Sequence, residues 1–230
     1  MKGLKVLGTV LSAFVVSAAL ASGWTVNVSI SRGLLFKPSQ PAITTNVPFN
    51  INSTTFSSAP VTHTVDTLPQ ITFLTAASIP PIVAGNGQDY TGTTFTAVYT
   101  ITSSRGPLTG FNFVVFGSVF GLGQITWTKK VVDRNTSQVL YVASGVFSGS
   151  SYPGGSDGIV GFSRFIALAR PSTNVQVIES FILHIDGARV PGADTAALAF
   201  VQQDWVPEPA SLGVLGAGLA GLIGLRRRMK

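Results

Sequence analysis

Apolar and polar residues alternate along much of this chain, with the period of two that is typical of a strand with one buried face. Runs of this kind, or runs rich in β-branched residues, cover residues 24–30, 61–68, 71–76, 95–101 and 125–132. Lys129 is the one polar residue that interrupts the apolar positions of the last run. These patterns predict strands that are buried on one face and exposed to solvent on the other.

Three further segments are more continuously apolar and are expected nearer the centre of the packed sheets. They are residues 111–120, 159–169 and 175–185. Turn residues separate the runs, because Asp and Asn tolerate turn dihedrals and cap their own backbone.

The turn at residues 133–136 predicts a hairpin between residues 125–132 and 137–143. Asp186-Gly187 predicts a second tight turn leading into residues 188–190. Loops rich in Pro, Gly and Ser are expected at residues 37–41, 80–87 and 148–158.

Nine or ten strands and no capped helical segment indicate an all-β fold for residues 22–204. We expect a single antiparallel β-sandwich, either jelly-roll-like or Ig-like. The length suits one domain, whose core is large enough to be stable without disulfide bonds.

The amino terminus has the pattern of a secretion signal. Lys2 and Lys5 precede an uncharged apolar stretch over residues 6–20, and Ala19 and Ala21 supply the small residues that a signal peptidase accepts. We therefore expect a signal helix in residues 1–21 with cleavage after Ala21, and export through the Sec machinery. The alternative, an uncleaved anchor, would need a longer apolar run.

The carboxyl terminus, residues 205–230, has three parts. Val206, Pro207, Glu208 and Pro209 come first, residues 210–225 are apolar apart from one serine, and a basic end follows. The basic residues are Arg226, Arg227, Arg228 and Lys230. A helix of the apolar residues would be about 24 Å long at ~1.5 Å per residue, close to the ~30 Å hydrocarbon core of a membrane.

The charges at the two ends predict the topology. Lys and Arg stay on the cytoplasmic side, so both basic clusters remain inside and the body between them is exported. The prolines prevent a strand or helix from continuing, which leaves Glu208 in an extended and accessible segment. The apolar helix and the arginines act as a stop-transfer anchor in the inner membrane.

This order of Pro-Glu-Pro motif, short apolar helix and basic end resembles the PEP-CTERM sorting tail of Gram-negative bacteria. The resemblance implies an exosortase-type membrane peptidase that recognises residues 207–209, cuts there and discards the helix. It also implies a final location at the cell surface or outside the cell, in the exopolysaccharide and biofilm context common to such proteins.

The charge of the body argues against a nucleic-acid partner. The chain has 15 Lys plus Arg and 9 Asp plus Glu, but six of the basic residues lie in the amino-terminal signal and the basic carboxyl end, so the rest of the chain is formally neutral. The chain has no cysteine, which excludes thiol chemistry, Cys-ligated zinc and attached haem.

A search for catalytic residues yields little. The two histidines, His63 and His184, lie in predicted strands, and strand alternation places Glu179 on the face opposite His184. Ser156 lies in a Gly-x-Ser-x-Gly sequence, but the helix that a nucleophile elbow requires does not follow it. We therefore expect no enzyme and no cofactor.

Metal and nucleotide motifs are also weak. Asp133, Asn135 and Ser137 place oxygen atoms on alternate residues, and Asp157 lies in a glycine-rich loop, but neither segment is a full calcium loop. The Gly-x-Gly-x-x-Gly sequence at residues 216–221 lies inside the apolar tail. The expectation is that the chain binds no metal.

Two functions remain open at this point. The first is a structural or glycan-interacting protein of the envelope or extracellular matrix, with exopolysaccharide as its candidate partner. The second is a secreted hydrolase that acts on envelope polysaccharide, which would need two convergent carboxyls or a Ser-His pair. Aromatic candidates for stacking on sugars are Trp24, Tyr90, Trp127, Tyr141, Tyr152 and Trp205.

Overall fold

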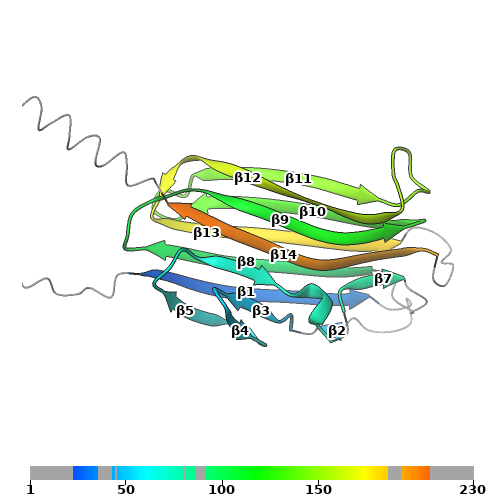
Figure 1. Cartoon of the computed structure of the whole chain (residues 1–230), viewed down its shortest axis with the longest axis horizontal. Helices are drawn as coiled ribbons and strands as arrows, with labels where there is room; N and C mark the ends of the chain where they lie inside the picture. Colours follow the sequence, from blue (N-terminus) through cyan, green and yellow to red (C-terminus); the bar gives the residue numbers. More distant parts are fainter. Residues whose placement is uncertain are drawn as a thin grey trace, which may run out of the picture.

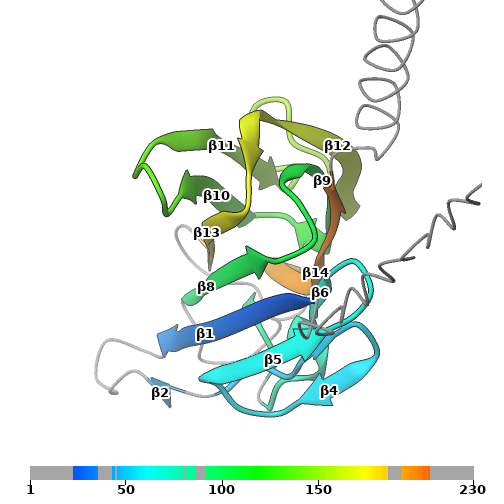
Figure 2. The same cartoon turned by 90° about the vertical axis from the view of Figure 1, so that its left-hand side faces the viewer.

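A computed structural model describes residues 23–35, 43–44, 46–79, 81–85, 92–185 and 193–207. In this part of the chain two seven-stranded antiparallel sheets pack into a sandwich (Figure 1; Figure 2). The expected all-β antiparallel sandwich is therefore confirmed. The expected signal helix and membrane helix lie outside the described residues, and no helix within them is long and apolar enough to span a membrane.

Sheet A has the strand order β11-β10-β13-β8-β1-β2, and β5 pairs with β1 on the same sheet. Its strands are β1 (Trp24–Leu35), β2 (Ile43–Thr44), β5 (Val61–Val65), β8 (Gly92–Ser103), β10 (Gly123–Asp133), β11 (Val139–Ser148) and β13 (Asn174–Ile185).

Sheet B has the order β12-β9-β14-β6-β3-β4, and β7 also pairs with β14. Its strands are β3 (Phe49–Ile51), β4 (Thr54–Phe56), β6 (Gln70–Phe73), β7 (Val83–Gly85), β9 (Leu108–Phe120), β12 (Gly158–Ser172) and β14 (Thr195–Pro207). A short 3-10 turn, Thr75–Ala77, follows β6.

The predicted hairpin is present as β10 and β11, which pair from Gln124 opposite Ser148 to Val131 opposite Tyr141. In the turn between these strands, the side chain of Asp133 accepts a hydrogen bond from the backbone N–H of Asn135. From β8 to β14, the other connections between successive long strands run from one sheet to the other. Together with β6, these strands form the four-stranded units β8-β13-β10-β11 in sheet A and β6-β14-β9-β12 in sheet B.

The core lies between the two sheets and follows from the alternation seen in the sequence. In β1 the buried positions are Trp24, Val26 and Val28, while Asn27 and Ser29 on the other face are exposed. Aromatic rings from both sheets meet in the middle of the sandwich. Phe73 of sheet B contacts Phe95 of sheet A edge to face, with ring centroids 5.4 Å apart, a favourable geometry.

The described residues contain fourteen strands, so the expected nine or ten was too low. The short strands β2, β3, β4 and β7 were not predicted, and neither was the long strand β14. The start of β14 is rich in alanine, which has low strand propensity. This strand continues through Trp205 to Pro207, three residues past the expected end of the body at residue 204.

The first described strand, β1, begins at the same end of the sandwich at which the last one, β14, ends. Trp24 at the start of β1 pairs with Ser103 at the end of β8, and Pro207 at the end of β14 pairs with Leu108 at the start of β9. Only the turn between β8 and β9 separates those two partners. Both ends of the body therefore leave the fold at one pole, as Figure 1 shows.

Candidate functional site

The sorting motif begins inside the last strand. Val206 pairs with Gly110 and Pro207 with Leu108 of β9. The hydroxyl of Thr109 donates hydrogen bonds to the carbonyl oxygens of Val206 and Pro207, at 3.4 and 3.2 Å. No spacer therefore separates the folded body from this motif. The other expected processing residues, Ala19, Ala21, Glu208, Pro209, Arg226, Arg227, Arg228 and Lys230, lie outside the described residues.

The two histidines considered for hydrolysis lie at opposite ends of the sandwich. His63 on β5 and Ile101 near the end of β8 both pair with Val26 of β1. His184 on β13 instead pairs with Gly92, at the start of β8. The His63 ring packs edge to face against Phe56, with centroids 5.3 Å apart. Among the described residues, no group of three or more His, Asp and Glu side chains could hold a metal ion.

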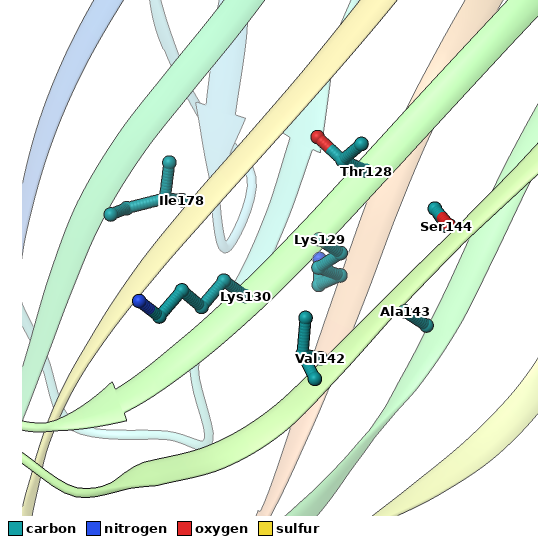
Figure 3. A pocket seen from close by; sticks show the side chains of 7 residues that line it. All are labelled: Thr128, Lys129, Lys130, Val142, Ala143, Ser144 and Ile178. Atoms are coloured by element: carbon teal, nitrogen blue, oxygen red, sulfur yellow. The ribbon is translucent and has the colours of Figure 1, made fainter.

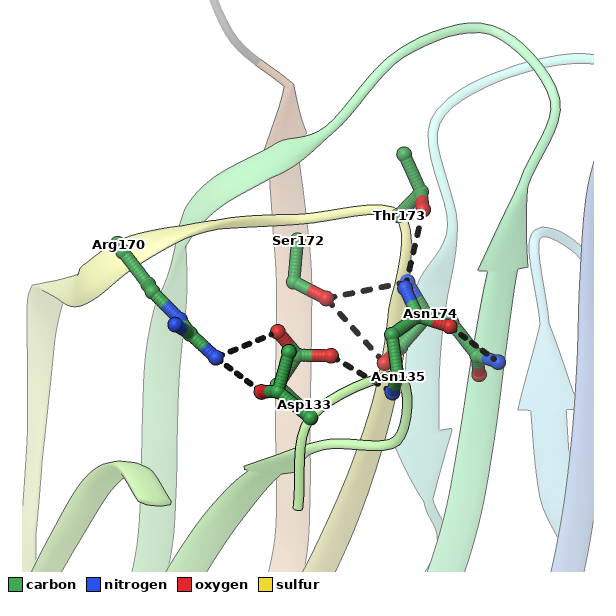
Figure 4. A network of polar contacts seen from close by, with 7 residues as sticks. Asp133, Asn135, Arg170, Ser172, Thr173 and Asn174 are labelled. Atoms are coloured by element: carbon green, nitrogen blue, oxygen red, sulfur yellow. Dashed lines mark hydrogen bonds and ion pairs between the residues drawn. The ribbon is translucent and has the colours of Figure 1, made fainter. Parts of the chain in front are cut away.

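The Asp133 carboxylate, a calcium candidate in the sequence, is engaged in a polar network at the end of the sandwich (Figure 4). Its oxygens accept hydrogen bonds from the backbone N–H of Asn135 at 2.8 Å and from Arg170 at 2.9 Å. Arg170 also donates to the hydroxyl of Thr136. Burial tends to raise the pKa of Asp133, but these donors and the Arg170 charge outweigh burial and lower it.

Asp157, the other calcium candidate, fixes the opposite end of the sandwich. Its carboxylate accepts hydrogen bonds from the backbone N–H and the hydroxyl of Ser150, at 2.9 and 2.8 Å, and from the N–H of Gly121 at 2.7 Å. The Ser150 donors, followed by Gly121, lower the pKa of Asp157. The side chain therefore ties the loop before β12 to the turn between β9 and β10.

An open groove of about 590 Å³ lies on the outer face of sheet A. It is lined by Thr128, Lys130, Val142, Ser144 and Ile178 of three neighbouring strands (Figure 3). Val142 is 69% exposed at its edge. The groove has no aromatic lining residue, so it offers hydrocarbon and hydroxyl contacts but no surface for ring stacking.

The outer face of sheet B carries a platform of aromatic and polar side chains. Phe116 of β9 and Phe200 of β14 pair across the strands and stack, with ring centroids 5.6 Å apart and planes 19° apart. Phe116 is 39% exposed, and the adjoining Ile159 of β12 is 75% exposed. An apolar hollow of about 220 Å³ opens beside Phe116 and Ile159.

Polar groups follow this pair along the same face of β14. Asp204 accepts hydrogen bonds from the side-chain amide of Gln70 at 2.8 Å and from that of Gln202 at 3.0 Å. Asn112 is the cross-strand neighbour of Asp204. We refer to Phe116, Phe200, Gln70, Asn112, Gln202 and Asp204 as the sheet B platform.

Three of the six aromatic residues proposed from the sequence for sugar stacking are in the core instead. Trp24, Trp127 and Trp205 are at most 4% exposed, and Tyr141 and Tyr152 are half-buried. Tyr90 lies outside the described residues. The sequence did not reveal Phe116 and Phe200, because Phe116 lies in a continuously apolar run and Phe200 in the strand that was not predicted. The alternation of Asn112, Val114 and Phe116 with buried residues was the available signal.

A second polar cluster lies in the core between the sheets. The amine of Lys129 donates to Oε2 of Glu179 at 2.5 Å, and both side chains are fully buried. The amide of Gln203 donates to both carboxylate oxygens of Glu179, at 3.1 and 3.0 Å. Lys129, which interrupted the apolar pattern in the sequence, thus belongs to a buried polar cluster whose members come from both sheets.

Comparison with solved structures finds only distant similarities. TmCBM61, solved in complex with beta-1,4-galactotriose, is 10% identical with a TM-score of 0.30, over 61% of this chain and 71% of that chain. The active domain of bacteriophage CBA120 tailspike protein 4 is 10% identical with a TM-score of 0.31, over 78% and 19%. A structure of carbohydrate-binding modules from the beta-sandwich super family is 10% identical with a TM-score of 0.22, over 77% and 98%. Scores this low carry no functional assignment.

No curated protein matches the sequence of the chain. A family model does match one segment, residues 206–228, and it describes the PEP-CTERM protein-sorting motif. The matched segment starts at Val206 and includes the Pro-Glu-Pro residues, the apolar stretch and the arginines. The carboxyl-terminal tail of this chain is therefore a PEP-CTERM sorting motif, and the resemblance seen in the sequence is confirmed.

Proposed function

We propose that this chain is an exported, non-catalytic protein of the cell envelope or extracellular matrix, whose body is a structural or glycan-interacting module. The observation that carries the proposal is the sorting motif at residues 206–228, attached directly to the last strand of the sandwich.

The proposed route has three steps. The Sec machinery exports the chain and a signal peptidase cuts after Ala21. The apolar tail then holds the body transiently at the inner membrane. An exosortase-type peptidase recognises Pro207, Glu208 and Pro209, cuts the chain there and releases the body to the surface or the medium.

This route is tested by fractionation and intact mass in a host with the native export and sorting machinery. Wild type is expected to lose residues 1–21 and the tail. Glu208→Gln is expected to stay membrane-bound with its tail intact, whereas Asp66→Asn, on an exposed turn of the body, is processed normally. A wild-type chain that keeps its tail, or that stays in the cytosol, contradicts the route.

We assign the body to the jelly-roll type rather than the Ig type. The assignment rests on the two units β8-β13-β10-β11 and β6-β14-β9-β12, in which successive strands cross between sheets except at the β10–β11 hairpin. That alternation is the double Greek key of a jelly roll. The arrangement leaves both outer sheet faces available for contacts.

The sheet B platform is the proposed glycan contact. Sugar rings present apolar faces that pack on aromatic rings, and their hydroxyls need nearby planar donors and acceptors. Phe116 and Phe200 supply the aromatic surface, and Gln202 and Asp204 supply polar groups along the same face.

Retention on immobilised exopolysaccharide from a producing strain tests the glycan contact. We expect Phe116→Ala and Phe200→Ala each to weaken retention about tenfold, since such a loss corresponds to ~1.4 kcal/mol. Val142→Ala, an exposed change on the opposite sheet, is the matched control and is expected to bind like wild type. If wild type is not retained, the glycan role fails and the structural role remains.

A further inference from the structure

The buried cluster of Lys129, Glu179 and Gln203 joins three central strands from both sheets. Lys129 pairs with Glu179 across β10 and β13 of sheet A, and Gln203 faces them from β14 of sheet B. Oε2 of Glu179 accepts from the lysine amine at 2.5 Å and from the glutamine amide at 3.0 Å. The amine and the carboxamide are therefore neighbours around a single oxygen atom.

Several polar atoms of this region are left without partners. Oε1 of Gln203 is buried and makes no hydrogen bond, and the same holds for the Tyr99 hydroxyl and Nε1 of Trp205. The reverse orientation of the Gln203 amide would set its oxygen against the carboxylate, so the unpaired atom is the carbonyl oxygen. A buried ion pair rarely stabilises a fold by itself, and unpaired polar atoms add a cost.

Aromatic contacts, which favour the ammonium form, and burial, which favours the neutral amine, act in opposite directions on Lys129. Its nitrogen lies 4.0 Å from the ring centroid of Phe113 and 5.0 Å from that of Phe111. Burial lowers the pKa of Lys129, although attraction to Glu179 acts in the opposite direction. A desolvated lysine beside a carboxylate can pass its proton to that carboxylate and become a nucleophile.

We propose that Lys129 and Gln203 form an intramolecular isopeptide bond across the sandwich, with Glu179 as the proton carrier. The ammonium of Lys129 first gives a proton to Glu179. The neutral amine then attacks the side-chain carbonyl carbon of Gln203, a nitrogen–carbon bond forms, and the carbonyl electron pair moves onto Oε1. Such an attack needs the amine to come within about 3.5 Å of the carbonyl carbon.

Proton transfer completes the exchange. Glu179 gives its proton to the amide nitrogen of Gln203 and takes one from the lysine nitrogen, so it acts as general acid and general base. The carbon–nitrogen bond of the carboxamide breaks, the carbonyl re-forms and ammonia leaves, taking the remaining proton of Glu179 as ammonium. One amide replaces another, so the reaction needs no oxidant or cofactor.

Two buried hydrogen-bond donors, the Tyr99 hydroxyl and Nε1 of Trp205, lie in the same region of the core. Trp205 follows Gln203 on the same face of β14, and its ring lies 6.4 Å from that of Tyr99, centroid to centroid. Burial, reinforced by the charge of Glu179, raises the pKa of Tyr99 well above its usual value, so its hydroxyl remains a proton donor. The side chain of Trp205, as a hydrogen-bond donor, acts in the opposite direction on this pKa, and donors held in a dry site can stabilise an oxyanion.

The product would link β10 of sheet A to β14 of sheet B through a covalent bond. The chain has no cysteine, so disulfides are not available to an exported body that must persist outside the cell. The isopeptide bond would take their place, and it resists reduction.

Peptide mapping of the chain purified after export tests this proposal. The expected result is one peptide pair joined through Lys129 and Gln203, lighter by about 17 Da, the mass of the ammonia that leaves when the amine displaces the amide. Trypsin is expected not to cut after Lys129, because its amine is acylated. A free Lys129 side chain and an intact Gln203 in the folded wild-type protein would overturn the proposal.

Variants separate the chemistry from a purely structural role. Gln203→Met and Glu179→Gln are expected to abolish the joined peptide, the first by removing the carboxamide and the second by removing the proton carrier. The exposed Lys130→Met and the half-buried Gln202→Met, each next to a reacting residue, are expected to retain it. If Glu179→Gln does not fold, Gln203→Met still decides, since a joined peptide in that variant would contradict the assignment.

Discussion

At the scale of single residues, the sequence marked the important positions but not their partners. Lys129 was visible as the one polar residue on an apolar face of its strand. Glu179 and Gln203 could not be assigned to it, because strand register and sheet packing bring them together from distant segments. Asp133 was predicted correctly as a turn residue, whereas its partner Arg170 comes from another strand.

The Asp133 carboxylate is expected to contribute stability that depends on pH. Asp133→Asn removes the ion pair with Arg170 and is expected to cost about 1–3 kcal/mol of unfolding free energy at neutral pH. The folded-state pKa lies below the unfolded value of about 4, so this contribution is present above that value and is lost as the pH falls through the folded pKa.

Urea unfolding of wild type and Asp133→Asn between pH 7 and pH 2 measures this effect. The difference between the two proteins is expected to shrink below pH about 4. Asp66→Asn, an exposed change, serves as the control and is expected to have little effect. A constant difference at all pH values would show that charge is not the cause.

At the scale of elements, the alternating strands were readable and β14 was not. The expected strands over residues 95–101, 125–132 and 175–185 are present as β8, β10 and β13. β14 was missed because its alanine-rich start resembles no strand pattern and its end had been assigned to the tail. Yet it is paired on both sides, with β9 and with β6 and β7.

Trp205 near the end of β14 is expected to be essential for the stability of the sandwich. It is 1% exposed, and its ring centroid lies 4.7 Å from that of Phe111. Trp205→Ala is expected to cost about 3–5 kcal/mol, because it leaves a cavity in the core. Guanidinium titration measures the free energy of unfolding of this variant. Val114→Ala, a half-buried change on the outer face of β9, is the control and is expected to lose less than about 1 kcal/mol.

At the scale of the whole molecule, the sequence predicted the class of fold and the sorting route, but not the contact surfaces. Alternation is a local property, so it identified a sandwich before the structure was known. The sheet B platform depends on the pairing of β9 with β14, which places Phe116 beside Phe200. No local pattern specifies that pairing.

The shared exit of β1 and β14 gives the body a defined orientation as long as its tail is anchored. The pole formed by the β8–β9 turn would face the lipid surface, and the loop held by Asp157 would point away from it. Because the chain lacks cysteine, single cysteines can report this directly. A bulky thiol reagent is expected to label Ser156→Cys several-fold faster than Arg134→Cys in intact spheroplasts, and equal rates are expected once the tail has been cut. The module would thus present its distal loops to the outside before its release, and its membrane-facing rim only afterwards.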